Sequence, residues 1–147
     1  ATDLMDYSCQ LGRRFRAIKL WFVLRHFGTA GLAAAIREHV ALAARLARRV
    51  DAHPLLERLA PAPLSVVCFR VRPEGEADET RLESLNARVL ERVNASGEVY
   101  LSHTKLRGRY CLRVAIGNLG TDARRVDRAF ALVCAAAGVD PGAGGVG

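Results

Sequence analysis

The sequence lacks most of the residues and motifs on which common catalytic sites depend. No G-x-S-x-G, H-E-x-x-H, phosphate-loop or G-x-G-x-x-G pattern is present. Lys19 and Lys105 are the only lysines among 22 basic residues, and the histidines stand apart from any partner spaced for a metal. Lys19 lies in an apolar stretch from which a helical lysine usually reaches out to solvent. The chain alone therefore does not look like a complete enzyme.

Cysteine pairs of the kind that bind zinc are also missing. The four cysteines lie far apart, at positions 9, 68, 111 and 134, and no C-x-x-C spacing occurs. Cys68, Cys111 and Cys134 sit inside apolar runs, where cysteine usually packs as a small core residue. We therefore expect reduced thiols and no metal site.

Aromatic residues are scarce, at 6% of the chain, and the net charge of +7 is scattered along it. A nucleic-acid-binding protein more often gathers its cations on one stripe with interleaved aromatics. No apolar run is long enough to span a bilayer, and the first residues show no signal-peptide pattern. The composition favours a globular cytoplasmic protein that binds neither nucleic acid nor membrane.

What the sequence does contain is an apolar stretch rich in arginine, LGRRFRAIKLWFVLRHFG, at residues 11–28. It predicts a helix over 14–27 that Gly28 ends. In its apolar part only Lys19 is polar, whereas a surface helix shows one apolar stripe and one polar face. A chain of 147 residues can bury a core, but it has difficulty covering such a helix on every side.

The middle of the chain predicts one helix, two strands and a second helix. Thr29 can cap a helix over 30–50. Its expected inward positions are Leu32, Ile36, Val40, Ala43, Ala47 and Val50, with Leu46 at the edge. Prolines make 54–63 an edge strand or a loop, and β-branched residues make 64–71 a central strand. Thr80 and Glu83 then form the T-x-x-E pattern of a capping box.

The last third predicts a hairpin and a closing helix. Strands over 99–106 and 109–116 are joined at Arg107-Gly108, where the glycine supplies the positive φ of a tight turn. Thr121 can cap a last helix, which Gly138 closes. The order α-α-β-β-α-β-β-α predicts an α+β fold with a mainly antiparallel sheet and helices on one face.

One long segment resembles a known family. DYSCQLGRRFRAIKLWFVLRHFGTAGLAAAIREHV, residues 6–40, resembles nearly residue for residue a segment of the pyridoxal-phosphate-dependent aromatic-L-amino-acid decarboxylases, the group II decarboxylases. LSVVCFRV, LRGRYCLRVAIGN and TDARRVDRAF are similar to later parts of the same family. The resemblance covers about residues 3–135.

The resemblance implies that the chain is the small C-terminal domain of a fold-type-I enzyme. Residues 1–28 would be a connector and buried helix, 29–138 the small domain and 139–147 a flexible tail. In the family, an earlier large domain carries the cofactor lysine, so pyridoxal 5'-phosphate would be bound mainly outside this chain and no catalytic residue would lie within it. The partners implied are the rest of the decarboxylase chain, a second subunit and a small amino-acid substrate.

The same resemblance gives the helix over 15–27 and its flanking residues a role. It implies that the helix is buried between the large domain, the small domain and the dimer partner. Gly12 would border the substrate pocket of the neighbouring subunit, with Arg13 as a further candidate; otherwise Gly12 serves a turn before the helix. Cations at a helix N-terminus are unfavourable, so Arg13, Arg14 and Arg16 pair with carboxylates elsewhere in the dimer or remain solvated.

Two functions follow from these observations. The first is a fragment, itself non-catalytic, of a decarboxylase that releases CO2 from an aromatic L-amino acid, with the cofactor as electron sink. The second is a stand-alone, basic α+β module for binding or dimerisation. Which amino acid is the substrate does not follow from these residues.

Overall fold

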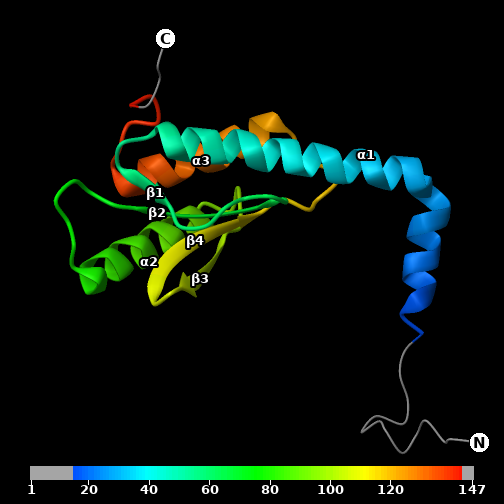
Figure 1. Cartoon of the computed structure of the whole chain (residues 1–147), viewed down its shortest axis with the longest axis horizontal. Coiled ribbons are helices and arrows are strands. Elements are labelled where there is room, and N and C mark those ends of the chain that lie inside the picture. The colour runs from blue at the N-terminus through cyan, green and yellow to red at the C-terminus, as the bar shows by residue number, and fades with distance from the viewer. Residues whose placement is uncertain (1–14, 144–147) are drawn as a thin grey trace, which may run out of the picture. The chain divides into compact units, whose positions relative to one another are not determined.

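The structure is a computed structural model that describes residues 15–143. The chain divides into two compact units, Ala1–Ala35 and Ile36–Gly147. The elements are α1 (Ala17–Ala52), β1 (Leu56–Arg58), β2 (Val66–Val71), α2 (Glu79–Ala95), β3 (Ser102–Leu106), β4 (Arg109–Ala115) and α3 (Ala123–Ala137), as labelled in Figure 1. Since α1 contains two helical stretches, the order of elements is the one that the sequence predicts.

Gly28 separates the two helical stretches of α1. Its backbone is not helical, with φ 65° and ψ 172°. An L-residue with a side chain rarely adopts such a φ, whereas glycine does so at little cost. The predicted break at Gly28 is confirmed. The first stretch begins at Ala17, slightly after the predicted start, and the second ends at Ala52 rather than Val50.

The strands form one four-stranded antiparallel sheet in the order β1-β2-β4-β3 within the described residues. β2 is central, since Phe69 pairs with Arg58 of β1 on one side and with Leu112 of β4 on the other. The expected edge strand and central strand are therefore both present. In the hairpin between β3 and β4, Arg107 (φ 51°) and Gly108 (φ 78°) both have positive φ, as a type I′ turn requires.

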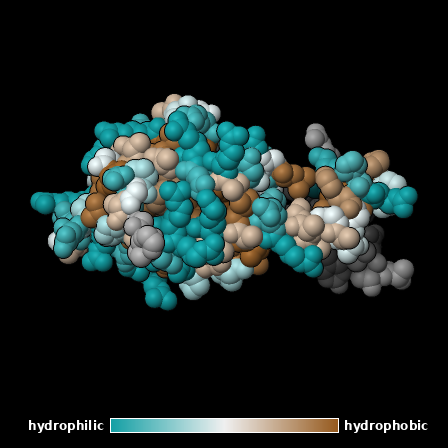
Figure 2. Space-filling model, turned by 90° about the horizontal axis from the view of Figure 1, so that it is seen from above, coloured by the Kyte–Doolittle hydropathy of each residue, from teal (hydrophilic) through white to brown (hydrophobic). Residues whose placement is uncertain are grey.

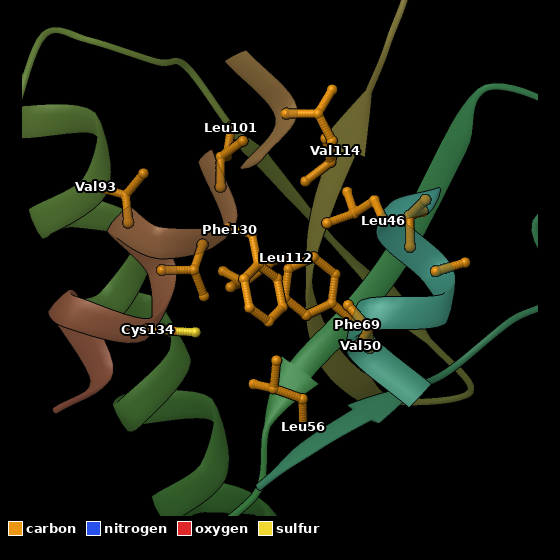
Figure 3. Close-up of a cluster of buried hydrophobic side chains, with 14 of the residues drawn as sticks. Leu46, Val50, Leu56, Phe69, Val93, Leu101, Leu112, Val114, Phe130 and Cys134 are labelled. Carbon is orange, nitrogen blue, oxygen red and sulfur yellow. The ribbon is translucent and has the colours of Figure 1, made fainter. Parts of the chain in front are cut away.

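One face of the sheet carries the hydrophobic core, to which all three helices contribute (Figure 3). In Figure 1 the second stretch of α1 lies beside α3, and an ion pair between Arg45 and Asp127 joins these two helices. The residues of α1 that reach the core are Leu42, Ala43, Leu46, Ala47 and Val50. Two details of the predicted stripe were wrong. Ile36, predicted to face inward, is exposed, and Leu42, which was not among the predicted inward positions, is buried. The buried side of the helix is therefore rotated from the predicted one towards Leu46.

The other face of the sheet carries polar and small side chains. Alternation along the strands directs every second residue to it. We call it the open face and define it by Val66, Cys68 and Arg70 of β2 and by Cys111, Arg113 and Ala115 of β4. Val66, Arg113 and Ala115 are exposed.

Two of the three predicted threonine caps, Thr80 and Thr121, were wrong, and an aspartate takes the position in each case. At α2 the side chain of Asp78 accepts hydrogen bonds from the backbone N–H groups of Thr80 and Arg81. Asp78 lies further upstream, so the helix starts before Thr80 can act as its cap. Glu83 does not close a capping box; its carboxylate pairs with Lys105, 2.7 Å away.

At α3 the cap is Asp122, whose carboxylate accepts from the backbone N–H of Arg125, and Thr121 lies before it. Gly138 ends the helix in a left-handed conformation, φ 72°, as predicted. The beginning of the expected flexible tail contacts the domain. Val139 packs against the core, and the Asp140 carbonyl lies 2.9 Å from Nε2 of His53. Residues 144–147 lie outside the described range.

A buried side-chain amide of α2 contacts the end of β2, and no pattern in the sequence predicts this contact. Asn86 of α2 accepts a hydrogen bond from the Val71 backbone N–H and donates to the carbonyl oxygens of Val71 and Leu82. The paired register of β2 with β4 ends at Phe69. Asn86 therefore satisfies backbone groups of β2 beyond that point, at a position where an unpaired polar group would be costly.

Candidate functional site

The two residues predicted to border a substrate pocket, Gly12 and Arg13, lie outside the described residues, as does Arg14. The structure therefore does not test their role, and it stays a prediction. Among the described residues, candidate functional features lie in three places: the N-terminal helical stretch, the open face of the sheet, and the contact between α1 and α3.

The first helical stretch exposes nearly all of its large apolar side chains. We call residues 15–27 the N-terminal apolar segment. Its exposed side chains are Phe15, Ile18, Leu20, Trp21, Phe22, Val23, Leu24 and Phe27. Trp21 and Phe22 are 55% and 58% exposed. Figure 2 shows brown and tan atoms uncovered in this part of the chain, at the right of the view. Contiguous exposed apolar side chains of this kind commonly occur at interfaces rather than on solvated surfaces.

The cations of this segment do not cover its apolar side chains. The guanidinium of Arg25 lies 5.8 Å from the centre of the Trp21 ring, a cation–π distance that leaves most of the ring exposed. Arg16 forms no ion pair with any of the residues 15–143. Arg16 therefore either pairs with a carboxylate outside this range or remains solvated.

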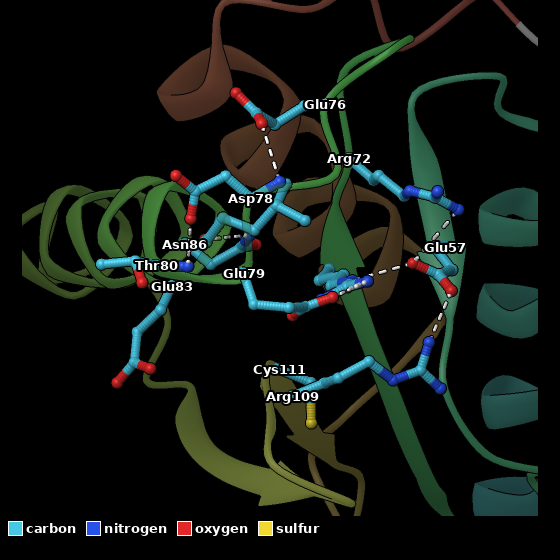
Figure 4. Close-up of polar contacts among 12 residues, drawn as sticks. Glu57, Arg72, Glu76, Asp78, Glu79, Thr80, Glu83, Asn86, Arg109 and Cys111 are labelled. Atoms are coloured by element: carbon cyan, nitrogen blue, oxygen red, sulfur yellow. Dashed lines mark hydrogen bonds and ion pairs between the residues drawn. The ribbon is translucent and has the colours of Figure 1, made fainter.

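Arg70 is the centre of an ion-pair network on the open face. Figure 4 labels the carboxylates Glu57 and Glu79 of this network, together with Arg109. Its side chain is only 3% exposed, and its guanidinium reaches Glu57 of β1 at 2.8 Å and Glu79 of α2 at 2.6 Å. Arg109 of β4 holds the second oxygen of Glu57 at 3.0 Å. The network therefore ties together β1, β2, β4 and the first turn of α2.

The carboxylates of this network are occupied by arginines and are poor candidates for proton transfer. The hydrogen bond from Arg70 lowers the pKa of Glu79, against the opposing effect of desolvation. A general base near neutral pH needs a pKa raised towards 7 rather than lowered. The network is thus a structural tie and not an acid–base pair.

A second set of charges joins α1 to α3. Asp127 accepts from Arg45 and from Arg49, each at 2.8 Å. The hydrogen bond from Arg45 is the largest of the effects that lower the pKa of Asp127. The Arg49 guanidinium also lies over the Phe130 ring, 4.1 Å from its centre. These contacts fix the outer surface of the helix pair and leave the carboxylate fully paired.

Neither lysine fits the attachment of pyridoxal phosphate. Lys105 is half exposed and paired with Glu83, and Lys19 is exposed in the N-terminal apolar segment. A lysine that forms a Schiff base needs a desolvated or cation-flanked amine, so the described residues do not fit the group and we derive no reaction step from them. Residues 15–143 also contain no group of three or more side chains suited to a metal. None of their helices is long and apolar enough to cross a membrane.

Taken together, the described part of the chain is an α+β module with an uncovered apolar helix and no complete catalytic centre. Residues 1–72 match the family described as the pyridoxal-dependent decarboxylase conserved domain. A tyrosine decarboxylase of Petroselinum crispum is 44% identical over 131 residues, which are 87% of this chain and 25% of the relative. A tryptophan decarboxylase of Camptotheca acuminata is 42% identical over 131 residues, 89% of this chain and 26% of the relative.

Another relative bears a different activity in its name. A phenylacetaldehyde synthase of Arabidopsis thaliana is 38% identical over 131 residues, 89% of this chain and 26% of its own length. The chain thus spans about a quarter of the length of the curated relatives it matches. Similarity of this part of the chain extends to both decarboxylases and aldehyde synthases.

Solved structures give the same relationship. The structure of Oryza sativa TDC with PLP and tryptamine matches with a TM-score of 0.80 and 35% identity, covering 93% of this chain and 29% of that one. Catharanthus roseus tryptophan decarboxylase in complex with L-tryptophan matches with a TM-score of 0.77 and 33% identity, over the same shares. The α+β fold is therefore that of part of a fold-type-I, pyridoxal-phosphate-dependent decarboxylase, as the sequence predicts.

Proposed function

We propose that this chain is one part of a pyridoxal-phosphate-dependent decarboxylase that releases CO2 from an aromatic L-amino acid. The observation that carries the proposal is the similarity to tryptophan and tyrosine decarboxylases along 87–89% of the chain, together with the matching fold. The described residues offer no lysine suited to the cofactor. The chain is therefore non-catalytic by itself, and residues of the longer protein bind the cofactor.

The partners of this part are the rest of the same decarboxylase chain and a second subunit. The N-terminal apolar segment is exposed around its helix, and one flat contact covers only one side of a helix. Two bodies on different sides remove more of this apolar surface from water. In the resulting cytoplasmic homodimer, Gly12 and Arg13 border the substrate pocket of the neighbouring subunit.

The test is an activity assay on the longer protein that contains this chain. It is supplied with pyridoxal phosphate and, in separate reactions, with L-tryptophan, L-tyrosine and L-glutamate as a non-aromatic control. CO2 released in equal amount with the aromatic amine supports the proposal. Aldehyde in place of amine assigns the activity of the phenylacetaldehyde synthases instead, and preference for glutamate contradicts the aromatic specificity.

A stand-alone basic module is the competing function, and the reading frame distinguishes the two. A frame that continues upstream into a lysine-bearing domain supports the decarboxylase. A start codon immediately upstream of the Ala1 codon, together with a protein in cells whose intact mass equals that of the 147 residues, would favour the module.

Gly12 gives a separate test of the pocket assignment. In the longer protein, Gly12→Val should lower kcat/KM by about a hundredfold while leaving the thermal unfolding temperature nearly unchanged, because small misplacements near substrate have effects of this size. Gly117→Val is the matched control, since a side chain there would meet nothing within 4 Å. Activity within about twofold of the wild type, a change below roughly 0.5 kcal/mol, or a collapse in stability would contradict the assignment.

A further inference from the structure

Two cysteines on neighbouring strands share the open face of the sheet. Cys68 of β2 pairs in register with Arg113 of β4, and Cys111 lies two residues before Arg113 on the same strand. Residues two apart on a strand point to the same face, so Cys68 and Cys111 are diagonal neighbours there. The third described cysteine, Cys134, lies on α3 within the core.

The two thiols differ in burial. Cys111 is fully buried, Cys68 is half-buried, and both are free thiols. The Cys111 thiol donates to the carbonyl oxygen of Thr104 at 3.5 Å. Burial is the largest of the effects that raise the pKa of Cys111 to about 11, and the charge and hydrogen bonding of Cys68 contribute to the same rise. Arg70, on the same face, acts in the opposite direction on this pKa.

The diagonal placement is unfavourable for a disulfide. Diagonal positions of an antiparallel pair are about 7–8 Å apart between α-carbons, whereas a disulfide needs at most about 6.8 Å. A metal ion held between the two sulfurs bridges a wider gap than an S–S bond of about 2.05 Å does. Two metal–sulfur bonds of about 2.3 Å separate the sulfur atoms by up to about 4.6 Å. The strands can therefore keep their register when the thiols share a metal ion.

We propose that Cys68 and Cys111 form a two-thiolate site for a soft monovalent cation of the Cu+ type. Thiolates select Cu+ over hard cations, and zinc requires four ligands, which the described residues do not offer here. On binding, the two S–H bonds break, two Cu–S bonds form, and two protons pass to solvent. No electron is transferred. Arg70, on the same face, lowers the pKa of Cys111 against the larger effect of burial.

The test measures Cu+ retained by the whole 147-residue chain under anaerobic conditions, in the presence of a competing Cu+ chelator. A Cys9→Ser background removes the one thiol outside the described residues. Native mass spectrometry should show one Cu+ per chain, lost in Cys68→Ser and retained in Cys134→Ala. Because Cys68 is half-buried, its serine variant should keep the fold, which circular dichroism checks independently of metal.

The affinity for Cu+ should fall by about tenfold for each unit by which the pH is lowered, for each proton that the ion displaces, because the ligands are thiolates. Retention of Cu+ by a folded Cys68→Ser variant overturns the proposal, and so does its loss in a folded Cys134→Ala variant. Rapid formation of a Cys68–Cys111 disulfide in air, seen as a loss of two hydrogen masses, would contradict the argument from strand separation. Each outcome is independent of decarboxylase activity, so failure here does not bear on the proposed function.

Discussion

The two helical stretches of α1 have similar apolar content and opposite environments. In the second stretch, Leu42, Leu46 and Val50 are all less than 5% exposed. In the first, Leu20, Trp21 and Phe22 are all more than half exposed. The difference shows that helix formation and burial are separate problems. Local sequence is enough for both helices, but only the second, in its part after Ala35, finds apolar partners within its compact unit.

The pattern of apolar residues explains why. Buried positions of the second stretch recur at steps of three and four, which produces one stripe and leaves room for arginines on the other side. The N-terminal apolar segment has apolar residues on every side, so no single neighbouring surface can cover them. A helix of this kind belongs in the interior of a larger assembly.

The largest expected effect comes from truncating one leucine in each stretch. Leu46→Ala should destabilise the chain by about 2–5 kcal/mol, because it removes a fully buried side chain and leaves a cavity. Leu24→Ala, at 45% exposure, should change stability by less than about 1 kcal/mol in the isolated chain. Urea unfolding followed by circular dichroism measures both. Equal losses would show that the first stretch is packed after all.

A second prediction concerns association. The chain should dimerise or aggregate through its N-terminal apolar segment, and the double substitution Trp21→Glu with Leu24→Glu should shift it to monomer. Leu119→Glu is the control, since Leu119 is equally exposed, at 57%, but lies outside the segment. Sedimentation velocity at several concentrations measures the association state of the wild type, the double variant and the control. A wild-type chain that stays monomeric at high concentration would contradict the assignment of this segment as an interface.

A third prediction concerns pH and tests the polar contacts of the second compact unit. The pKa of Glu79 is lowered in the folded chain, so its pairing with Arg70 stabilises the fold above the ordinary carboxylate pKa of about 4.3. That stabilisation is lost as pH falls through the lowered pKa. Glu79→Gln should therefore lower the unfolding temperature at pH 7, and the difference from wild type should shrink below about pH 4.

Glu91→Gln is the control for this measurement, because Glu91 is an exposed carboxylate on the same helix. It should leave the unfolding temperature nearly unchanged at both pH values. A difference between Glu79→Gln and wild type that stays constant down to pH 3 would show that the Arg70 network does not contribute through its charge.

The smallest expected effect is at the hairpin turn. Arg107 adopts a positive φ of 51°, which costs a residue with an ordinary side chain more than it costs asparagine. Arg107→Asn should therefore stabilise the chain by about 0.5 kcal/mol, and Gly108→Ala should destabilise it by about 1 kcal/mol. Thermal unfolding of the two variants checks this. A loss of stability in Arg107→Asn would mean that the arginine side chain contributes more than the backbone strain.

Helix caps and buried polar contacts were the parts that sequence reasoning predicted least well. Thr80 and Thr121 each satisfy a capping pattern, but Asp78 and Asp122 provide the caps. Ser, Thr, Asp and Asn all suit this position, so a pattern cannot choose between neighbouring candidates. No sequence pattern indicated a role for Asn86, because that role depends on where the hydrogen-bonded pairing of β2 with β4 ends.

The order of elements, the break at Gly28, the central strand and the hairpin turn could all be predicted from the sequence, because they follow from local backbone preferences and from apolar periodicity. The sequence also predicted that one apolar helix would need cover. The folded chain was needed to show that Arg70 joins Glu57 to Glu79 and that Cys68 lies diagonal to Cys111. Such contacts depend on strand register and on side chains far apart in the chain, which no local pattern specifies.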